Sequence, residues 1–247
     1  LIMILGLIPS RLNSRRLKEK PLMLIDQLPI VVHAFKRAKL SKKLDEVIVC
    51  TDHRKIVEVV KKYGGHAILT SKKHKNGTER IYEVAKKFKK AKLIVDIQGD
   101  QPLIDPKAID LTVDFHKKNK HFDIVLPSMP ITSDIENRNL VKSTFTSNGK
   151  LLYFSRAKTP FKYKKINFSY YKNLSIISFK PKALKTFFYS EMGPIEKIEG
   201  IELMRALENN LSIGTFVVKG SDFAVDVNED LMKAMDLMPR DKIRKLY

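Results

Sequence analysis

Residues 46–63 read EVIVCTDHRKIVEVVKKY, an apolar run followed directly by an amphipathic stretch. The apolar run at residues 46–50 predicts a short buried strand. In the second half, apolar side chains recur at the i, i+3, i+4 and i+7 spacing of one helix face, at Ile56, Val59, Val60 and Tyr63. A strand that passes within a few residues into a helix is the repeating unit of an α/β fold.

The same alternation extends along the first half of the chain. Apolar runs predict further strands at residues 3–8, 66–69, 93–97 and 124–126. Helical spacing predicts helices at residues 29–40, 78–88 and 106–117. Short connections between these elements indicate a mainly parallel sheet with helices on both faces. Because such crossovers are right-handed, the carboxyl ends of the strands share one edge, where α/β proteins bind their ligands.

The pattern changes after about residue 127. Two apolar stretches, residues 141–146 and 151–155, flank Ser147-Asn148-Gly149-Lys150, which predicts a hairpin with an Asn-Gly turn. Later strands are expected at residues 174–179 and 213–218, and helices at 181–188, 195–209 and 228–238. We therefore expect one domain over residues 1–247, with a core at 1–127 and 211–247. An inserted mixed α+β lobe at about 128–210 would carry substrate or dimer contacts.

The net charge is strongly positive. Lys and Arg number 47 and Asp and Glu 27, which gives +20 over 247 residues. Nucleic acid, a membrane surface or an acidic small substrate would each suit that charge. The lysines form scattered doublets and Trp is absent, whereas a nucleic-acid footprint shows clustered arginines and stacking aromatics. The prediction is a solvated lysine-rich surface and small anionic ligands, with no nucleic-acid or membrane partner.

Cysteine use and hydropathy predict a cytoplasmic protein. The single cysteine, Cys50, argues against a disulfide framework and a cysteine-based zinc site. No apolar run approaches the roughly 20 residues of a membrane helix. Residues 1–8, which begin at Leu1, are too short for such a helix and lack the preceding basic region of a signal peptide.

The segment that follows the first strand is rich in cations. Residues 8–22 read IPSRLNSRRLKEKPL and carry Arg11, Arg15, Arg16, Lys18 and Lys20. At the ligand edge of the sheet, arginine forks and lysine point charges suit a triphosphate. The segment lacks the glycines of a Walker loop or a GxGxxG turn, which disfavours an ATPase or a nicotinamide enzyme. An exposed basic loop without a ligand is the alternative.

Two aspartates are candidates for a divalent metal. Asp100 follows the strand at residues 93–97 within QGDQP, and Asp226 ends an apolar run. Mg²⁺ prefers one or two carboxylates combined with phosphate oxygens. The alternatives are a turn role for Asp100 and a helix cap at Asp226.

A glycine turn opens the helix expected at residues 78–88. Residues 76–80 read NGTER, and the free backbone N–H groups of such a turn can bind a phosphate or a base. Ordinary helix initiation is the alternative.

Six segments occur together in one order and spacing. They are IPSRLNSRRLKEKPL at 8–22, TDH at 51–53, NGTER at 76–80, QGDQPLIDP at 98–106, YFSRAKTPF at 153–161 and VDVNEDL at 225–231. Together they resemble the CMP-KDO synthetase family, the 3-deoxy-manno-octulosonate cytidylyltransferases, over nearly the whole chain. Lys20-Pro21-Leu22 resembles this family rather than the related sialic-acid activators.

The resemblance implies a Rossmann-like nucleotide-diphospho-sugar transferase fold, a homodimer and Mg²⁺ as cofactor. It implies transfer of CMP from CTP to the anomeric hydroxyl of 3-deoxy-manno-octulosonate (KDO) or a related 2-keto sugar acid, for lipopolysaccharide or other surface glycans. The residues implied for CTP are Pro9, Ser10, Arg11, Arg15, Lys20, Gly77, Arg80, Gln98 and Asp100. Those implied for the sugar acid are Gln98, Lys142, Arg156, Asn173 and Glu202. Those implied for catalysis are Arg11, Lys20 and the metal-binding pair Asp100 and Asp226.

The chain departs from the family in its sugar-facing half. Residues 173–179 read NLSIISF where the family usually has HLGIYGY, and Leu203 stands where an amide is usual. A site that loses hydrogen-bonding groups toward one sugar discriminates against that sugar. An amino-KDO-like or nonulosonic acid is therefore an alternative substrate. A nucleotide-binding relative without activity and a basic nucleic-acid-binding protein are alternatives of a different class.

Overall fold

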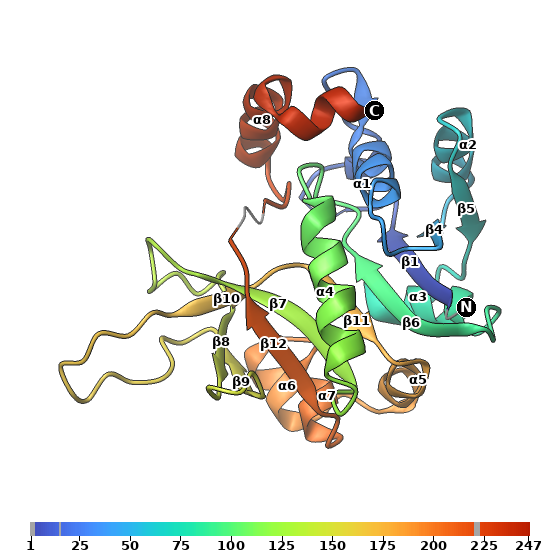
Figure 1. The fold of residues 1–247 in the computed structure, drawn as a ribbon. Helices are drawn as coiled ribbons and strands as arrows, with labels where there is room; N and C mark the ends of the chain where they lie inside the picture. Colours follow the sequence, from blue (N-terminus) through green and yellow to red (C-terminus); the bar gives the residue numbers. More distant parts are fainter. Residues whose placement is uncertain (1–2, 15, 220–222) are drawn as a thin grey trace.

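The computed structural model describes residues 3–14, 16–219 and 223–247, and its centre is a large twisted sheet (Figure 1). Within the described residues this sheet has ten strands in the order β5-β4-β1-β6-β11-β7-β10-β8-β9, with β12 paired to β7. Its strands are β1 (Met3–Ser10), β4 (Glu46–Thr51), β5 (His66–Leu69), β6 (Ala91–Ile97), β7 (Ile124–Pro130), β8 (Lys142–Phe145), β9 (Leu151–Ser155), β10 (Tyr171–Asn173), β11 (Ile176–Phe179) and β12 (Ile213–Val217). A separate two-stranded ribbon is formed by β2 (Leu24–Ile25) and β3 (Leu28–Pro29).

The helices lie on both faces of the sheet. The α-helices are α1 (Ile30–Lys39), α2 (Arg54–Lys62), α3 (Gly77–Ala85), α4 (Pro106–Lys118), α5 (Pro181–Tyr189), α6 (Pro194–Glu199), α7 (Met204–Glu208) and α8 (Asn228–Leu237). Short 3-10 helices are η1 (Lys20–Leu22), η2 (Met238–Arg240) and η3 (Lys242–Leu246). The predicted α/β fold with a mainly parallel central sheet is confirmed.

Strand β1 shows why the layers form. Its buried residues alternate between two cores: Ile4 and Ile8 pack with the apolar sides of α1, α2 and α4. Leu5 and Leu7 pack with α3 and α5 on the opposite face. Successive side chains of a strand point to opposite faces, so a continuously apolar strand needs helices on both sides.

Strands β5, β4, β1 and β6 pair in parallel, which places the carboxyl ends of β1 and β6 side by side. Strand β11 then enters antiparallel between β6 and β7. The segment expected as an inserted lobe, 128–210, thus contributes a strand to the middle of the sheet. Its strands β10, β8 and β9 extend the same sheet in antiparallel order.

Of two local predictions, the hairpin after residue 141 is confirmed and the long helix after residue 195 is wrong. The hairpin is confirmed, because β8 and β9 pair antiparallel and Gly149 has φ of +80° in the turn between them. The single helix expected at 195–209 is wrong, because the chain forms α6 and α7 instead. Gly200 ends α6 with φ of +62°, a left-handed conformation that glycine adopts without steric cost and that stops a helix.

His116 of α4 is buried against β11 and provides a pH-dependent contribution to stability. Its Nδ1 lies 2.8 Å from Ser178 Oγ and its Nε2 lies 3.2 Å from the Phe122 carbonyl oxygen. Burial lowers the pKa of His116 to about 4, from an ordinary 6.5. At a pH between these two pKa values, His116 is protonated in the unfolded chain and neutral in the folded chain. Acidification through this window therefore reduces the free energy of unfolding, by up to about 1.4 kcal/mol per pH unit.

The variant His116→Gln removes this proton linkage. We expect its free energy of unfolding to fall less steeply than that of the wild type as the pH is lowered from 6.5 toward 4. Urea unfolding of both proteins across this range measures the two slopes. Equal slopes would contradict the linkage, whatever the variant's absolute stability.

Candidate active site

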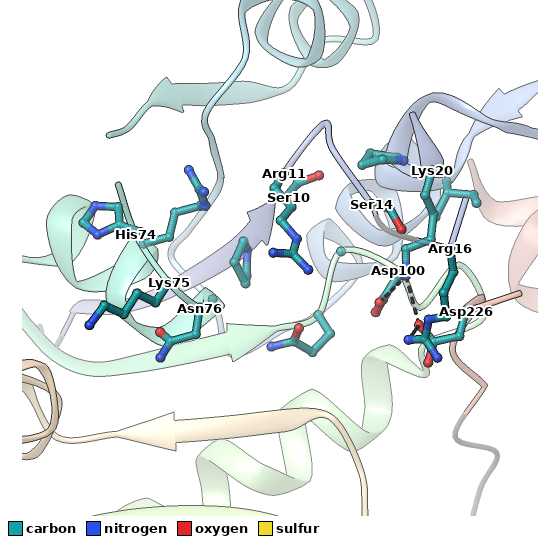
Figure 2. A pocket seen from close by; sticks show the side chains of 17 residues that line it. Ser10, Arg11, Ser14, Arg16, Lys20, His74, Lys75, Asn76, Asp100 and Asp226 are labelled. Atoms are coloured by element: carbon teal, nitrogen blue, oxygen red, sulfur yellow. Dashed lines mark hydrogen bonds and ion pairs between the residues drawn. The ribbon is translucent and has the colours of Figure 1, made fainter. Parts of the chain in front are cut away.

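A cavity of about 410 Å³ opens at the carboxyl ends of β1 and β6 (Figure 2). It is bounded by the loop after β1, the start of α3, the loop after β6 and the chain before α8. Of the residues predicted for the site, those that line it are Pro9, Ser10, Arg11, Lys20, Gly77, Arg80, Gln98, Asp100 and Asp226. Arg15 lies outside the described residues. The structure thus brings together segments separated by more than a hundred residues.

Further polar side chains complete the lining, and they are Ser14, Arg16, His74, Lys75 and Asn76. Arg16 was among the cations expected to suit a triphosphate, and Ser14 and Asn76 belong to the segments at 8–22 and 76–80. Figure 2 shows His74, Lys75 and Asn76 on one side of the cavity and Lys20, Arg16, Asp100 and Asp226 on the other, with Arg11 between them. Arg16 belongs to the basic run of the sequence. His74 and Lys75 directly precede a glycine turn, and only this position in the sequence could have indicated that they line the cavity.

The loop after β6 packs closely against the end of β1 because Gly99 has no side chain. A Cβ atom at this position would lie 2.8 Å from the Pro9 carbonyl oxygen, which no alanine would tolerate without a shift of the backbone. Close packing therefore explains why the QGDQP segment has glycine at this position. The close approach sets the following residue, Asp100, beside the basic loop.

Lys20 joins three parts of the chain. Its Nζ donates to Asp100 Oδ2 at 2.7 Å, to Asp226 Oδ1 at 3.2 Å and to the Val225 carbonyl oxygen at 2.8 Å. Arg16 Nη2 adds an ion pair with Asp226 Oδ1 at 2.8 Å. Two carboxylates and two cations thus meet at one end of the cavity, and only the Lys20 side chain among them is largely buried.

This junction suits a divalent cation that is shared with a phosphate. Asp100 and Asp226 reach one positive charge at once, and two carboxylates plus phosphate oxygens are a ligand set that Mg²⁺ prefers. Among the residues that the structure describes, no group of three or more His, Cys, Asp or Glu side chains could hold a metal. The remaining ligands would come from phosphate oxygens, water or other oxygen atoms of the cavity.

The opposite end of the cavity is built around the start of α3. Asn76 caps this helix, and its Oδ1 accepts from the Glu79 N–H at 2.8 Å. Arg80 is buried and donates to Thr70 Oγ1 at 2.6 Å and to Asp52 Oδ2 at 3.3 Å. Asp52 also accepts from the Leu12 N–H at 3.1 Å. The TDH segment therefore braces the basic loop against α3, which is a structural explanation for that motif.

Three of the residues predicted for the sugar bond to the protein itself. Lys142 is buried, and its Nζ donates to the carbonyl oxygens of Asn137 and Arg156 at 2.6 and 3.0 Å. Arg156 donates to the Glu199 carbonyl oxygen at 2.7 Å. Asn173 Oδ1 accepts from Ser128 Oγ at 2.9 Å. These three side chains and Glu202 lie outside the cavity lining, and their roles toward a sugar stay predictions.

Two buried carboxyl groups lie directly behind the cavity wall. Asp96 of β6 accepts from Gln98 Nε2 through both oxygens, at 3.1 and 3.2 Å. Burial, and then the charges of Glu202 and Asp100, hold the pKa of Asp96 well above its usual range. Burial likewise raises the pKa of Glu202, whose Oε1 is buried without a hydrogen-bond partner. Asp96 was overlooked in the sequence, although an acid inside the apolar run VDI is the signal that marks it.

A mainly parallel α/β sheet whose loops collect arginines, lysines and two aspartates around one cavity has the architecture of a nucleotidyltransferase. A family model described as "Cytidylyltransferase" matches residues 5–213. A solved structure of CMP:2-keto-3-deoxy-manno-octonic acid synthetase complexed with CTP superposes with a TM-score of 0.93 at 28% identity, over 96% of this chain and 99% of that chain.

Curated relatives agree with this match. The 3-deoxy-manno-octulosonate cytidylyltransferase of Thermodesulfovibrio yellowstonii is 37% identical, over 91% of this chain and 93% of its own. The 8-amino-3,8-dideoxy-manno-octulosonate cytidylyltransferase of Shewanella putrefaciens is 35% identical, over 92% and 95% respectively. The chain belongs to the CMP-KDO synthetase family of cytidylyltransferases, as the sequence motifs indicated.

Proposed function

We propose that this protein transfers CMP from CTP to the anomeric hydroxyl of KDO or a closely related 2-keto sugar acid, releasing pyrophosphate. The observation that carries the proposal is the junction of Lys20, Asp100 and Asp226 in a cavity that also contains Arg11 and Arg16. Both substrates are anions. The cavity contains cationic side chains that can bind them, next to two carboxylates that suit a metal ion. The names of the relatives and the match to a CTP complex support the same reaction.

The reaction forms one bond at phosphorus and breaks another. The anomeric oxygen attacks the α-phosphorus and loses its proton, while the bond to the bridging oxygen breaks and pyrophosphate leaves with the electron pair. No protein nucleophile is required, so catalysis consists of alignment and charge stabilisation. Arg11, Arg16 and Lys20 supply the positive charge for the phosphate oxygens. Of these, Lys20 is already held before substrate arrives, by Asp100, Asp226 and the Val225 carbonyl oxygen.

Mg²⁺ fits the carboxylate pair, and we propose that Asp100 and Asp226 hold it. When bound, the ion would neutralise phosphate charge and lower the pKa of the attacking hydroxyl. Lys20 reaches the same two carboxylates, so it orients them toward one point. Arg16 restrains Asp226 from the other side.

We also propose that the protein is a cytoplasmic homodimer in surface-glycan synthesis, such as that of lipopolysaccharide. Residues 156–170 project from the sheet between β9 and β10 (Figure 1). They expose Phe161, Tyr163 and Ile166, at 84%, 87% and 59% of their surface, and apolar side chains exposed together favour a protein contact. Among the described residues no helix is long and apolar enough to cross a membrane. Light scattering after size exclusion measures the oligomeric state, and a monomer at micromolar concentration would contradict the dimer.

The activity is tested by pyrophosphate release from CTP, screened over a panel of 2-keto sugar acids with Mg²⁺ present. We expect release that depends on the sugar acid, and a CMP-sugar product in equal amount. Tight CTP binding without release for any sugar would favour a nucleotide-binding relative without activity. Salt-dependent binding of nonspecific DNA that CTP does not affect would favour a nucleic-acid-binding protein instead.

A further inference from the structure

The Lys20 side chain ends among three oxygen atoms at the acidic end of the cavity. Its ammonium donates to Asp100 Oδ2 at 2.7 Å, to the Val225 carbonyl oxygen at 2.8 Å and to Asp226 Oδ1 at 3.2 Å. An ammonium has three N–H donors, so all three are used within the protein. Lys20 therefore has no free donor for a phosphate oxygen until it gives up at least one of these contacts.

The three oxygens that surround the ammonium are of the kind that binds hard divalent cations. Two belong to carboxylates and one to a backbone carbonyl, and both kinds are ligands of such ions in proteins. The backbone beside them is held by contacts that do not involve Lys20. The Val225 N–H donates to the Asp100 carbonyl oxygen at 3.0 Å, and the Asp226 N–H donates to Asp230 Oδ2 at 2.9 Å. Lys20 therefore uses the same carboxylates that we propose for the metal, and their backbone positions do not depend on it.

The backbone at Lys20 is fixed, whereas its side chain is long enough to change partners. The Lys20 N–H donates to the Leu17 carbonyl oxygen at 3.2 Å, and the Lys20 carbonyl oxygen accepts from the Met23 N–H at 3.1 Å. Pro21, which follows in η1, is buried. A lysine carries its charge on a flexible four-carbon stem. The ammonium can therefore leave the carboxylates by rotation of side-chain bonds, while the loop that carries it stays closed.

Two positive charges at the same pair of carboxylates repel each other. The Lys20 side chain is only 12% exposed, so water screens this repulsion less than it does at an open surface. Arg16 already pairs with Asp226 at 2.8 Å, and Arg11 lines the same cavity. An ammonium displaced by a metal alone would thus enter surroundings that are already positive. The phosphate oxygens of CTP would give it an anionic partner.

We propose that the Lys20 ammonium is a resident counter-ion of Asp100 and Asp226, which gives way to the divalent cation and moves to the phosphates when the nucleotide binds. Metal binding and nucleotide binding then favour each other, because the ammonium displaced by the metal is paired by the nucleotide, and such coupling is reciprocal. The protein without nucleotide accordingly binds the metal weakly. The inference rests on the proposed cytidylyltransferase activity and specifies how its two ligands are coupled.

The test measures binding of Mn²⁺, as a probe for the Mg²⁺ site, from the electron paramagnetic resonance signal of the free ion. No sugar acid is added, so no transfer occurs. Without nucleotide, we expect Lys20→Met to bind Mn²⁺ about tenfold more tightly than the wild type, because the competing charge is gone.

The same measurement with CTP determines the coupling, after correction for the Mn²⁺ that CTP binds by itself. We expect the gain in Mn²⁺ affinity on addition of CTP to be about tenfold smaller in Lys20→Met than in the wild type. Lys118→Met, at an exposed position of α4 outside the cavity lining, loses the same charge and is the control. It should bind Mn²⁺ as the wild type does, with and without CTP.

A crystal structure of the wild type with CTP and Mg²⁺ gives a second readout, which decides the question even if Lys20→Met does not fold. We expect Lys20 Nζ to lie within hydrogen-bond distance of a phosphate oxygen and to have left at least one carboxylate. Equal or weaker Mn²⁺ binding by Lys20→Met without nucleotide would overturn the exchange, as would a complex in which Nζ keeps all three oxygens. Both results leave cytidylyl transfer intact. A wild type that binds neither CTP nor Mn²⁺ in the presence of CTP would instead overturn the proposed function.

Discussion

Replacing Lys20 by methionine is expected to lower kcat by about 100- to 1,000-fold, the size of effect seen when one preorganised donor to a developing negative charge is removed. Lys20 is the cation that meets both predicted metal ligands, and its side chain is only 12% exposed. Methionine fills similar space and retains the apolar stem without the charge. The loss should appear in kcat more than in the KM for the sugar acid, since the charge acts on the phosphates.

A measurement of Mg²⁺ binding distinguishes the role of Lys20 from that of the two carboxylates. Because the Lys20 ammonium pairs with Asp100 and Asp226 in the free protein, its removal leaves these carboxylates to a metal. We expect the thermal midpoint of the Lys20→Met variant to rise more with added Mg²⁺ than that of the wild type. Lys18→Met, in the same segment but exposed and outside the cavity lining, is the matched control. Near-normal turnover of the Lys20 variant would contradict a catalytic role.

The fold was predictable where local pattern decides the structure. Strand β1 is apolar on both faces because helices cover both faces, and that requirement is visible in the run at residues 3–8. The position of β11 was not predictable, since insertion of an antiparallel strand between β6 and β7 depends on pairing between residues 53 to 85 positions apart along the chain. The break at Gly200 was missed because helical spacing continues through it, although a left-handed glycine is a common helix end.

The site was predictable in part for a similar reason. The ends of β1 and β6 meet because the two strands are parallel neighbours, so Arg11 and Asp100 could be placed at one edge in advance. Lys142 and Arg156 were assigned to the sugar acid from the family resemblance, but their bonds to carbonyl oxygens are set by tertiary packing that the sequence does not display. Asp96 illustrates the opposite error. One acid in an apolar strand was taken as part of the strand, although a buried carboxyl group needs a partner.

Replacing Asp100 by asparagine is expected to lower kcat by about 1,000-fold, which corresponds to about 4 kcal/mol of transition-state stabilisation. The amide keeps the shape of the side chain and loses the charge that pairs with Lys20 at 2.7 Å and that would hold Mg²⁺. CTP still meets Arg11 and Arg16 in the cavity, so the KM for CTP should change far less than kcat. The measurement is pyrophosphate release over a Mg²⁺ titration, with the amino or hydroxy sugar acid that the wild type uses better.

The form of the titration distinguishes a metal ligand from a merely structural carboxylate. Loss of one of two carboxylate ligands weakens metal binding, so the Mg²⁺ concentration at half-maximal rate should rise for Asp100→Asn, and likewise for Asp226→Asn. A structural defect would reduce the rate equally at every Mg²⁺ concentration and leave that midpoint in place. Asp236→Asn, exposed on α8, loses the same charge away from the cavity and should behave as the wild type. Near-normal turnover of Asp100→Asn at saturating Mg²⁺ would show that Asp100 is not a catalytic metal ligand, and the cavity's cations alone would then have to account for phosphate activation.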